Sequence, residues 1–163
     1  MNAALLAIWN RIAPDRDAEF NAWYEEEHLA ERLALPGFRS ARRYRDVDDP
    51  YAYCVLYELD SPMVLRSPAY LERLAEPSPR TRAIMPHFAD VSRAACRVAF
   101  DSTPGAPSHA WLALLAVPRA DAPASRAAPA GIRLRMAIPD PSATGGPTPE
   151  QRLRPEADRL PGS

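Results

Sequence analysis

The sequence is poor in glycine and cysteine and has no lysine, and each shortage narrows the classes of protein that it can encode. Only 6 of 163 residues are glycine, and no phosphate-cradling loop, nucleophile elbow or metal motif is present, which argues against a nucleotide-binding site. Cys54 and Cys96 lack the spacing of a zinc site or a disulfide framework, so we expect two buried free thiols. The 20 basic residues are all arginine, which is typical of a GC-rich bacterial genome.

A strong net charge and a long apolar run are also lacking. The net charge is −1, so we expect no nucleic-acid partner and no attraction to an anionic membrane. No stretch approaches the roughly 18 to 20 apolar residues that span a bilayer. The apolar N-terminus, Met1 to Ile12, carries neither a basic leading cluster nor a cleavage site. We therefore expect a cytoplasmic protein of one domain, or of one domain with an appendage.

The first element of the chain is predicted to be a buried strand that leads into a helix. Residues 3–12 form a nearly unbroken apolar run, as in a strand that is covered on both faces. Asp15 stands where it can cap a following helix. One face of that helix carries Phe20, Trp23, Tyr24 and Glu27. From residue 29 onward the leucines fall on the opposite side, so we expect the helix to end or kink at about His28.

Three further strands and several short helices are predicted before residue 102. Alternating or β-branched and aromatic residues indicate strands at 38–45, 51–59 and 92–100. Three Ser-Pro pairs, at residues 61, 67 and 78, each place a capping serine before a proline at a first helical position. Starts so close together predict short helical pieces between the third and fourth strands.

This order of elements is that of a ferredoxin-like βαββαβ unit, an α+β fold with an antiparallel sheet and helices on one face. The first and third strands are apolar on both faces, so the helix-free face needs a cover as well. The same face of a second copy is the simplest cover, and we therefore predict a homodimer. The topology also holds Cys54 and Cys96 about two strand spacings apart, beyond disulfide reach.

The composition changes after residue 102. We divide the chain into a ferredoxin-like domain at 1–102, a linker with a partial second unit at 103–138, and a disordered tail at 139–163. The partial unit contains two predicted strands, Trp111–Val117 and Ile132–Ile138. These strands either lengthen the sheet or cover its open face within the same chain, in competition with the dimer.

Three groups of residues are candidates for chemistry. The first lies on the helix, where Tyr24 and His28 are four residues apart and Glu27 points toward apolar surroundings, a plausible acid/base set. The alternative is that His28 only interacts with the carbonyl end of the helix. The second group is Arg42 and Tyr44, which alternation along the strand places on one face of the sheet. If that face is the interior of the barrel, Arg42 would stabilise an oxyanion. The alternative is that both residues belong to a solvated edge strand.

The third candidate is His87, at the junction that leads into the last strand of the domain. A histidine that follows a proline in a loop either lines a pocket or faces water. We include His87 with Trp23 and Tyr44 as possible substrate-binding residues. We predict no metal site and no resident cofactor, and haem held by His28 is the alternative.

The sequence resembles the dimeric α+β barrel superfamily, and within it the EthD-like proteins, over roughly residues 3 to 100. The segments that carry this resemblance are Phe20–Tyr24, Glu27–Leu29, Pro36–Phe38, Ala41–Tyr44, Leu56–Leu59 and Ser67–Tyr70. The resemblance implies a ferredoxin-like fold, a back-to-back sheet dimer and a pocket between helices and sheet that a helix-borne histidine, here His28, lines. Activities in the superfamily include cofactor-independent oxygenation and the isomerisation or cyclisation of ring compounds, with haem chemistry in distant branches.

The resulting functional prediction is a small-molecule enzyme, an isomerase, cyclase or cofactor-independent oxygenase that acts on an aromatic or lactone-like compound. His28 would act as the general base or acid, Tyr24 and Glu27 would orient it, and Arg42 would stabilise an oxyanion. Two alternatives stay open. One is a non-catalytic ligand-binding or accessory protein of a catabolic or biosynthetic pathway, and the other is a haem-binding protein.

Overall fold

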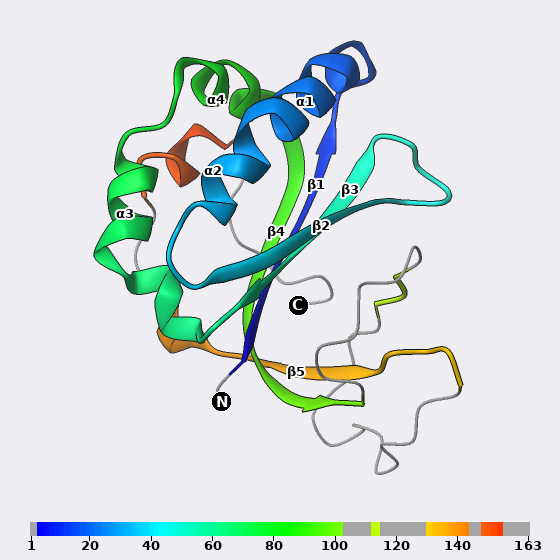
Figure 1. The fold of residues 1–163 in the computed structure, drawn as a ribbon. Helices are drawn as coiled ribbons and strands as arrows, with labels where there is room; N and C mark the ends of the chain where they lie inside the picture. Colours follow the sequence, from blue (N-terminus) through cyan, green and yellow to red (C-terminus); the bar gives the residue numbers. More distant parts are fainter. Residues whose placement is uncertain (1–2, 103–111, 115–129, 144–147, 155–163) are drawn as a thin grey trace.

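A computed structural model describes residues 3–102, 112–114, 130–143 and 148–154. Its centre is a five-stranded antiparallel sheet in the order β2-β3-β1-β4-β5 (Figure 1). The strands are β1 (Ala4–Ile12), β2 (Phe38–Arg45), β3 (Ala52–Leu59), β4 (Phe88–Asp101) and β5 (Arg135–Pro139). The first four strands have the connections and order of the ferredoxin-like α+β fold, which confirms the fold predicted from the sequence.

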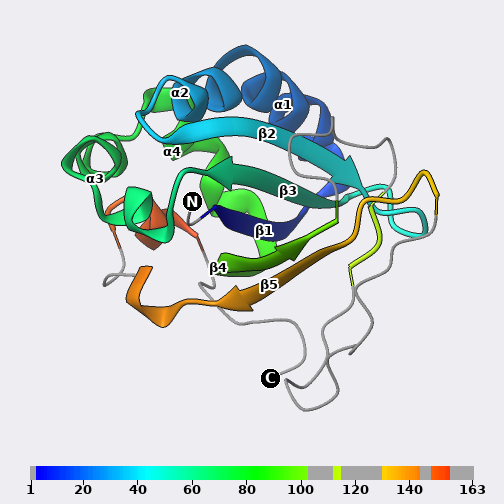
Figure 2. The ribbon, with the colours of Figure 1, turned by 60° about the horizontal axis from the view of Figure 1, so that its bottom comes forward.

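The helices lie together on one face of the sheet (Figure 2). They are α1 (Asp17–Trp23), α2 (Leu29–Leu33), α3 (Pro68–Ala75) and α4 (Pro79–Ile84), with 3₁₀ turns at Pro14–Arg16, Pro62–Arg66 and Met85–His87. The prediction of short helical pieces is confirmed. Ser67 and Ser78 accept hydrogen bonds from the backbone N–H groups of Tyr70 and Thr81, whereas Ser61 makes no such side-chain cap.

Between α1 and α2 the helix does not end but widens into a π-helical turn, Tyr24–His28. The sequence predicts an end or kink at about His28, and the wider turn is the way in which the chain absorbs the change of apolar phase. On a regular α-helix, residues four apart drift by about 40° at each step. A π-helical turn contains one extra residue and removes part of this drift. As a result Phe20, Tyr24, His28 and Arg32 are all buried on the side that faces the sheet.

The sheet has a covered face and a helix-free face, and the register decides which residues lie on each. Residues directly opposite each other on neighbouring strands share a face. Leu6 of β1 pairs with Tyr57 of β3, and both lie in the core beneath the helices. Residues next to Leu6 and Tyr57 in the sequence point to the opposite, helix-free face. Cys96 lies on this face because it pairs with Leu5, and Cys54 lies there because it pairs with Trp9.

Both cysteines are free thiols in the structure. Burial raises the pKa of the Cys54 thiol to about 12 and also raises the pKa of Cys96. Within the described residues, no helix is long and apolar enough to cross a membrane.

The second half of the chain departs from the predictions in part. The strand expected at Ile132–Ile138 lengthens the sheet as β5, which pairs with β4. The other expected strand, Trp111–Val117, lies outside the described residues except for 112–114, which have no strand structure. The tail at 139–163 was expected to be disordered, but residues 141–143 and 151–153 form 3₁₀ turns, and Glu150 is only 2% exposed. A buried ion pair, described below, holds this part of the tail.

Candidate functional site

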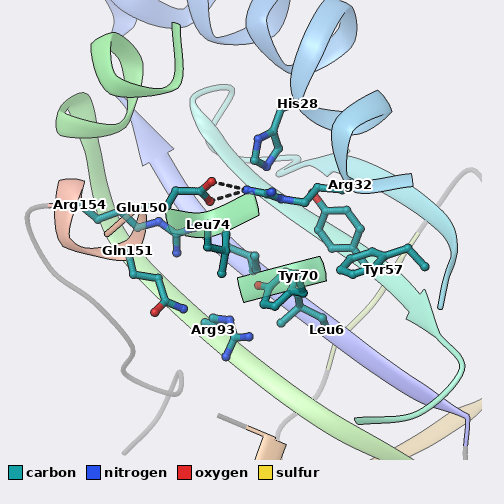
Figure 3. A pocket seen from close by; sticks show the side chains of 12 residues that line it. Leu6, His28, Arg32, Tyr57, Tyr70, Leu74, Arg93, Glu150, Gln151 and Arg154 are labelled. Carbon is teal, nitrogen blue, oxygen red and sulfur yellow. Dashed lines mark hydrogen bonds and ion pairs between the residues drawn. The ribbon is translucent and has the colours of Figure 1, made fainter. Parts of the chain in front are cut away.

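A pocket lies between α2, α3, the sheet and the C-terminal segment 148–154 (Figure 3). Its polar and aromatic walls include His28, Arg32, Tyr57, Tyr70, Arg93 and Glu150. The cavity left between these side chains is about 10 Å³, which is about the space of one water molecule. The pocket is therefore almost filled by the chain's own side chains.

His28 is buried in the wall of this pocket and is 4% exposed. Its imidazole lies against the Trp23 indole, with ring centroids 4.2 Å apart, and meets the Tyr24 ring edge-on at 5.0 Å. Its Nδ1 atom has no hydrogen-bond partner within the described part of the chain. Burial, reinforced by the charges of Arg32, Arg154 and Arg73, holds the pKa of His28 well below its ordinary value. The imidazole is consequently neutral at physiological pH and can accept a proton.

The hydroxyl of Tyr24, whose ring contacts His28, meets the hydroxyl of Tyr57, which lines the same pocket. The Oη atoms of Tyr24 and Tyr57 are 3.4 Å apart and share a hydrogen bond in which either one can donate. Burial raises the pKa of Tyr24 and raises that of Tyr57 well above its usual range. Both hydroxyls therefore keep their protons. Tyr57 lines the pocket. When the Tyr24 hydroxyl donates its proton to the Tyr57 oxygen, the Tyr57 hydroxyl can donate its own proton to a ligand.

Arg32 and Glu150 form an ion pair inside the pocket. The Nη2 atom of Arg32 lies 2.5 Å from each carboxylate oxygen of Glu150, and the two side chains are 5% and 3% exposed. Burial, the largest single effect, lowers the pKa of the Arg32 guanidinium, but Glu150 and the nearby Tyr70 and Tyr57 together raise it, so the net shift is upward. Arg32 is thus charged, and its Nη1 atom is buried without a hydrogen-bond partner in the described part of the chain.

Positive charge exceeds negative charge around this pair. Arg93 and Arg154 also line the pocket, and Arg93 is 7% exposed. Neither forms an ion pair with any residue that the structure describes. Glu150 is the one carboxylate among the described lining residues. The pocket consequently has more hydrogen-bond donors than its own acceptors can satisfy.

The structure brings only part of the predicted catalytic set together. Tyr24 and His28 touch as rings, as their spacing predicts. Glu27 instead accepts a hydrogen bond from Ser78 Oγ and lies 3.9 Å from the guanidinium of Arg80. Glu27 was expected to orient His28, but no hydrogen bond joins these two side chains in the described part of the chain. Trp23 is a core side chain whose Nε1 donates to Thr81 Oγ1 at 3.1 Å.

Three other predicted residues lie away from the pocket. Arg42 and Tyr44 pair with Leu56 and Cys54, so they are on the helix-free face of the sheet, opposite to His28. It is their neighbour Arg43 that points toward the helices, with its guanidinium 4.8 Å from the centre of the Tyr24 ring. His87 is exposed at the end of its 3₁₀ turn and is not part of the pocket wall.

Sequence reasoning missed several site residues, including Arg32, Tyr57, Arg93 and Glu150. Arg32 follows His28 by four residues, so the helical spacing of the pair was a usable signal. Arg93 alternates with Ala94 along β4, and the alternation itself was predicted. Arg93 pairs with Ile8 on the side of β4 that faces the pocket, so it is buried although arginine is usually exposed in an alternating strand.

No protein-family model matches this chain, and no curated protein matches its sequence. Among solved structures, it is similar to a protein of Bordetella bronchiseptica provisionally assigned as an antibiotic biosynthesis monooxygenase, with 13% identity and a TM-score of 0.45 over 58% of this chain and 95% of that one. SnoaB, a cofactor-independent oxygenase from Streptomyces nogalater, has 12% identity and a TM-score of 0.42 over 58% and 91% of the two chains.

Rv0793 from Mycobacterium tuberculosis has 16% identity and a TM-score of 0.43 over 57% of this chain and 91% of that one. At these values the fold assignment rests on the strand order of the chain itself. The specific closeness to EthD-like proteins stays a prediction.

Proposed function

We propose that this protein is a small-molecule enzyme that moves a proton on a ring compound, with His28 as the base. The observation that carries the proposal is a neutral, buried imidazole in a pocket wall, whose Nδ1 has no hydrogen-bond partner among the described residues. The protonated hydroxyl of Tyr57 lines the same pocket and is paired with that of Tyr24. Arrangements of this kind, with pKa values displaced by burial, are typical of sites of proton transfer.

In the proposed reaction, His28 removes a proton from a carbon next to a carbonyl group of an aromatic or lactone-like compound. The electron pair of the broken C–H bond moves toward the carbonyl, whose oxygen becomes an enolate oxygen. Tyr57 donates a hydrogen bond to this oxygen, while Tyr24 donates to Tyr57. In an unsaturated substrate this enolate is conjugated with a neighbouring C=C bond. The imidazolium of His28 then returns the proton to the far carbon of that bond, the double bond shifts, and the step yields an isomer and restores the neutral base.

The role of oxyanion donor passes in this proposal from Arg42 to Tyr57. Arg42 lies on the helix-free face of the sheet, whereas the Tyr57 side chain lines the pocket that contains His28. The proposed reaction needs no resident cofactor. The proposal keeps the cytoplasmic location that the sequence favours.

Deuterium exchange tests the proposal without knowledge of the natural substrate. The protein is incubated in D₂O with a panel of unsaturated lactones and hydroxylated aromatic ketones, and deuterium on ring carbons is followed by NMR. We expect catalysed incorporation into at least one compound, lost in His28→Gln and kept in His87→Gln, whose side chain is exposed. Binding without incorporation would favour the ligand-binding alternative, and a Soret band abolished by His28→Gln after haem addition would favour the haem alternative.

We also propose that the protein is a homodimer that pairs through the helix-free face of its sheet. Leu56 and Cys54 lie on this face, and each is only partly buried in the single chain. Light scattering at micromolar concentration should give twice the mass of one chain. A substitution of Leu56 by Arg should reduce the mass to that of a monomer, whereas Leu71→Arg, at an exposed position of α3, should leave it unchanged.

A further inference from the structure

The segment 148–154 reaches the pocket from a distant part of the chain and carries the carboxylate that fills it. Glu150 contacts Arg32 across a separation of 118 residues in the sequence. The backbone N–H of Glu150 donates to the carbonyl of Leu74 at 3.1 Å, and Leu153 packs against the edge of the core. Figure 3 shows Glu150, Gln151 and Arg154 entering the pocket from one side. The segment therefore supplies one whole wall of the pocket.

The guanidinium of Arg32 is not saturated by Glu150. Both carboxylate oxygens contact Nη2, and Nη1 remains buried without a partner in the described residues. A planar guanidinium can instead hold a carboxylate through two parallel hydrogen bonds, one from each of two nitrogens. A carboxylate that approaches Arg32 in this way would satisfy more donors than Glu150 does.

The surroundings of Arg32 favour a further negative group and a flat apolar body. Arg93 and Arg154 add positive charge, and the Nε and Nη1 atoms of Arg154 are buried without partners in the described part of the chain. Phe38 and Tyr70, stacked with centroids 5.7 Å apart, form an aromatic wall together with Tyr57. Aromatic side chains in such a wall pack well against the face or edge of a planar ring.

We propose that Arg32 binds the carboxylate of a ring-containing organic acid, and that Glu150 occupies this position when no ligand is bound. The proposal rests on the proposed function, because it names the class of compound that enters the same pocket. A ligand of this class replaces the Glu150 carboxylate and displaces the segment 148–154, which enlarges the pocket next to His28. The segment thus acts as a built-in competitor of the ligand.

The first test measures binding of benzoate and of its uncharged counterpart benzamide by calorimetry. Glu150→Gln keeps the shape of the side chain but removes its charge, so benzoate should bind at least tenfold more tightly to this variant than to the unaltered protein. The affinity for benzamide should change less than threefold. In the double variant Arg32→Met with Glu150→Gln, the preference for benzoate should disappear. Equal benzoate affinities in the unaltered protein and the Glu150→Gln variant, or no benzoate binding to that variant, would overturn the proposal.

The second test follows displacement of the segment in the unaltered full chain. Trypsin cleaves after Arg152, an exposed residue of the segment, only when the backbone around it opens. Benzoate should accelerate this cleavage at least threefold, while benzamide should not, and cleavage after exposed Arg45 in the main domain should be unaffected. Cleavage after Arg152 that is slowed or unchanged at benzoate concentrations that saturate binding would show that the segment is not displaced.

The two proposals can fail separately. If the benzoate experiments succeed but no compound exchanges deuterium, the pocket binds organic acids without proton transfer. If deuterium exchange succeeds and depends on His28, but benzoate binds without regard to Arg32 and Glu150, the enzyme proposal stands and the acid-binding proposal is wrong.

Discussion

The imidazole ring of His28 packs against the indole ring of Trp23 in a tilted arrangement, with their centroids 4.2 Å apart and their planes inclined by 35°. Trp23 is itself fixed by the hydrogen bond from its Nε1 to Thr81 of α4. The histidine is consequently held in one orientation by packing, and no described carboxylate is hydrogen-bonded to it. In the ligand-free protein a protonated imidazolium at this position would be buried among arginines, with no anionic partner in the described part of the chain. The folded protein without ligand therefore favours the neutral form.

The first prediction concerns stability and pH. The pKa of His28 is lowered in the folded protein, whereas the unfolded chain binds this proton near pH 6.5. Below about pH 6.5 the unfolded state therefore binds more protons than the folded state. The free energy of unfolding then falls as the pH decreases, and His28 contributes up to about 1.4 kcal/mol per pH unit to this fall. Urea denaturation between pH 7 and pH 5 should show a steeper loss for the unaltered protein than for His28→Gln.

His87 supplies the control for this experiment, because its side chain is exposed. His87→Gln should keep the full dependence on pH. Parallel stability curves for the unaltered protein and His28→Gln would contradict the view that His28 is buried in its neutral form.

The second prediction concerns the buried pair Arg32 and Glu150. Removal of one partner leaves the other charge buried without compensation, and Glu150→Ala should lower the free energy of unfolding by about 3–5 kcal/mol. Arg32→Met combined with Glu150→Met removes both charges and should recover most of this loss. Urea denaturation at pH 7.5 measures both effects. A loss for Glu150→Ala below about 1 kcal/mol, the size typical of an exposed pair, would show that the segment is not docked in solution.

The third prediction compares two serines that precede prolines. Ser78 caps α4 through the backbone N–H of Thr81 and also donates to Glu27, whereas Ser61 makes no side-chain cap. Ser78→Ala should therefore reduce stability by about 1–2 kcal/mol. Ser61→Ala should change it by less than about 0.5 kcal/mol. Thermal or urea unfolding distinguishes the two, and equal losses would contradict the cap.

The fourth prediction compares two glycines with positive φ. Gly37 has φ of 88°, and a Cβ added there would lie 2.5 Å from Cγ2 of Val64, so Gly37→Ala combines backbone strain with a clash. Gly131 has φ of 78°, but nothing lies within 4 Å of an added Cβ. Gly131→Ala should cost about 1 kcal/mol, and Gly37→Ala should cost about 2–4 kcal/mol in urea denaturation. A smaller loss at Gly37 than at Gly131 would be inconsistent with the close approach of Val64.

The strand and helix pattern of the first hundred residues was predictable because it depends on local signals. Phe38–Arg45 is a strand with the bounds that its alternation predicts, and the Ser-Pro pairs mark the starts of short helices. β4 is longer than expected: it begins at Phe88 and not at Ser92, because Phe88 and Val91 pack into the core before the alternating stretch starts.

The site was predictable only where it is local. Tyr24 and His28 are neighbours on one helix, and their contact follows from their spacing. The partner of Arg32 lies 118 residues away in a stretch rich in proline and polar residues, where no periodicity signals an ordered segment. The face on which Arg42 lies was left conditional, since alternation separates the two faces of a strand but does not tell which one the helices cover.

The extra residue in the turn Tyr24–His28 also determines how this gene can change in length. Five residues of a π-helical turn advance about as far around the helix axis as four residues of a regular α-helix. Loss of one codon at exposed Glu26 would therefore convert the wide turn into a regular one and leave Arg32 on the side of the helix that faces Glu150. Loss of a second codon would have no wide turn to absorb it and would rotate Arg32 away from Glu150 by about 100°. Sequences descended from this one should therefore tolerate the loss of one residue between Trp23 and Arg32, but not of two.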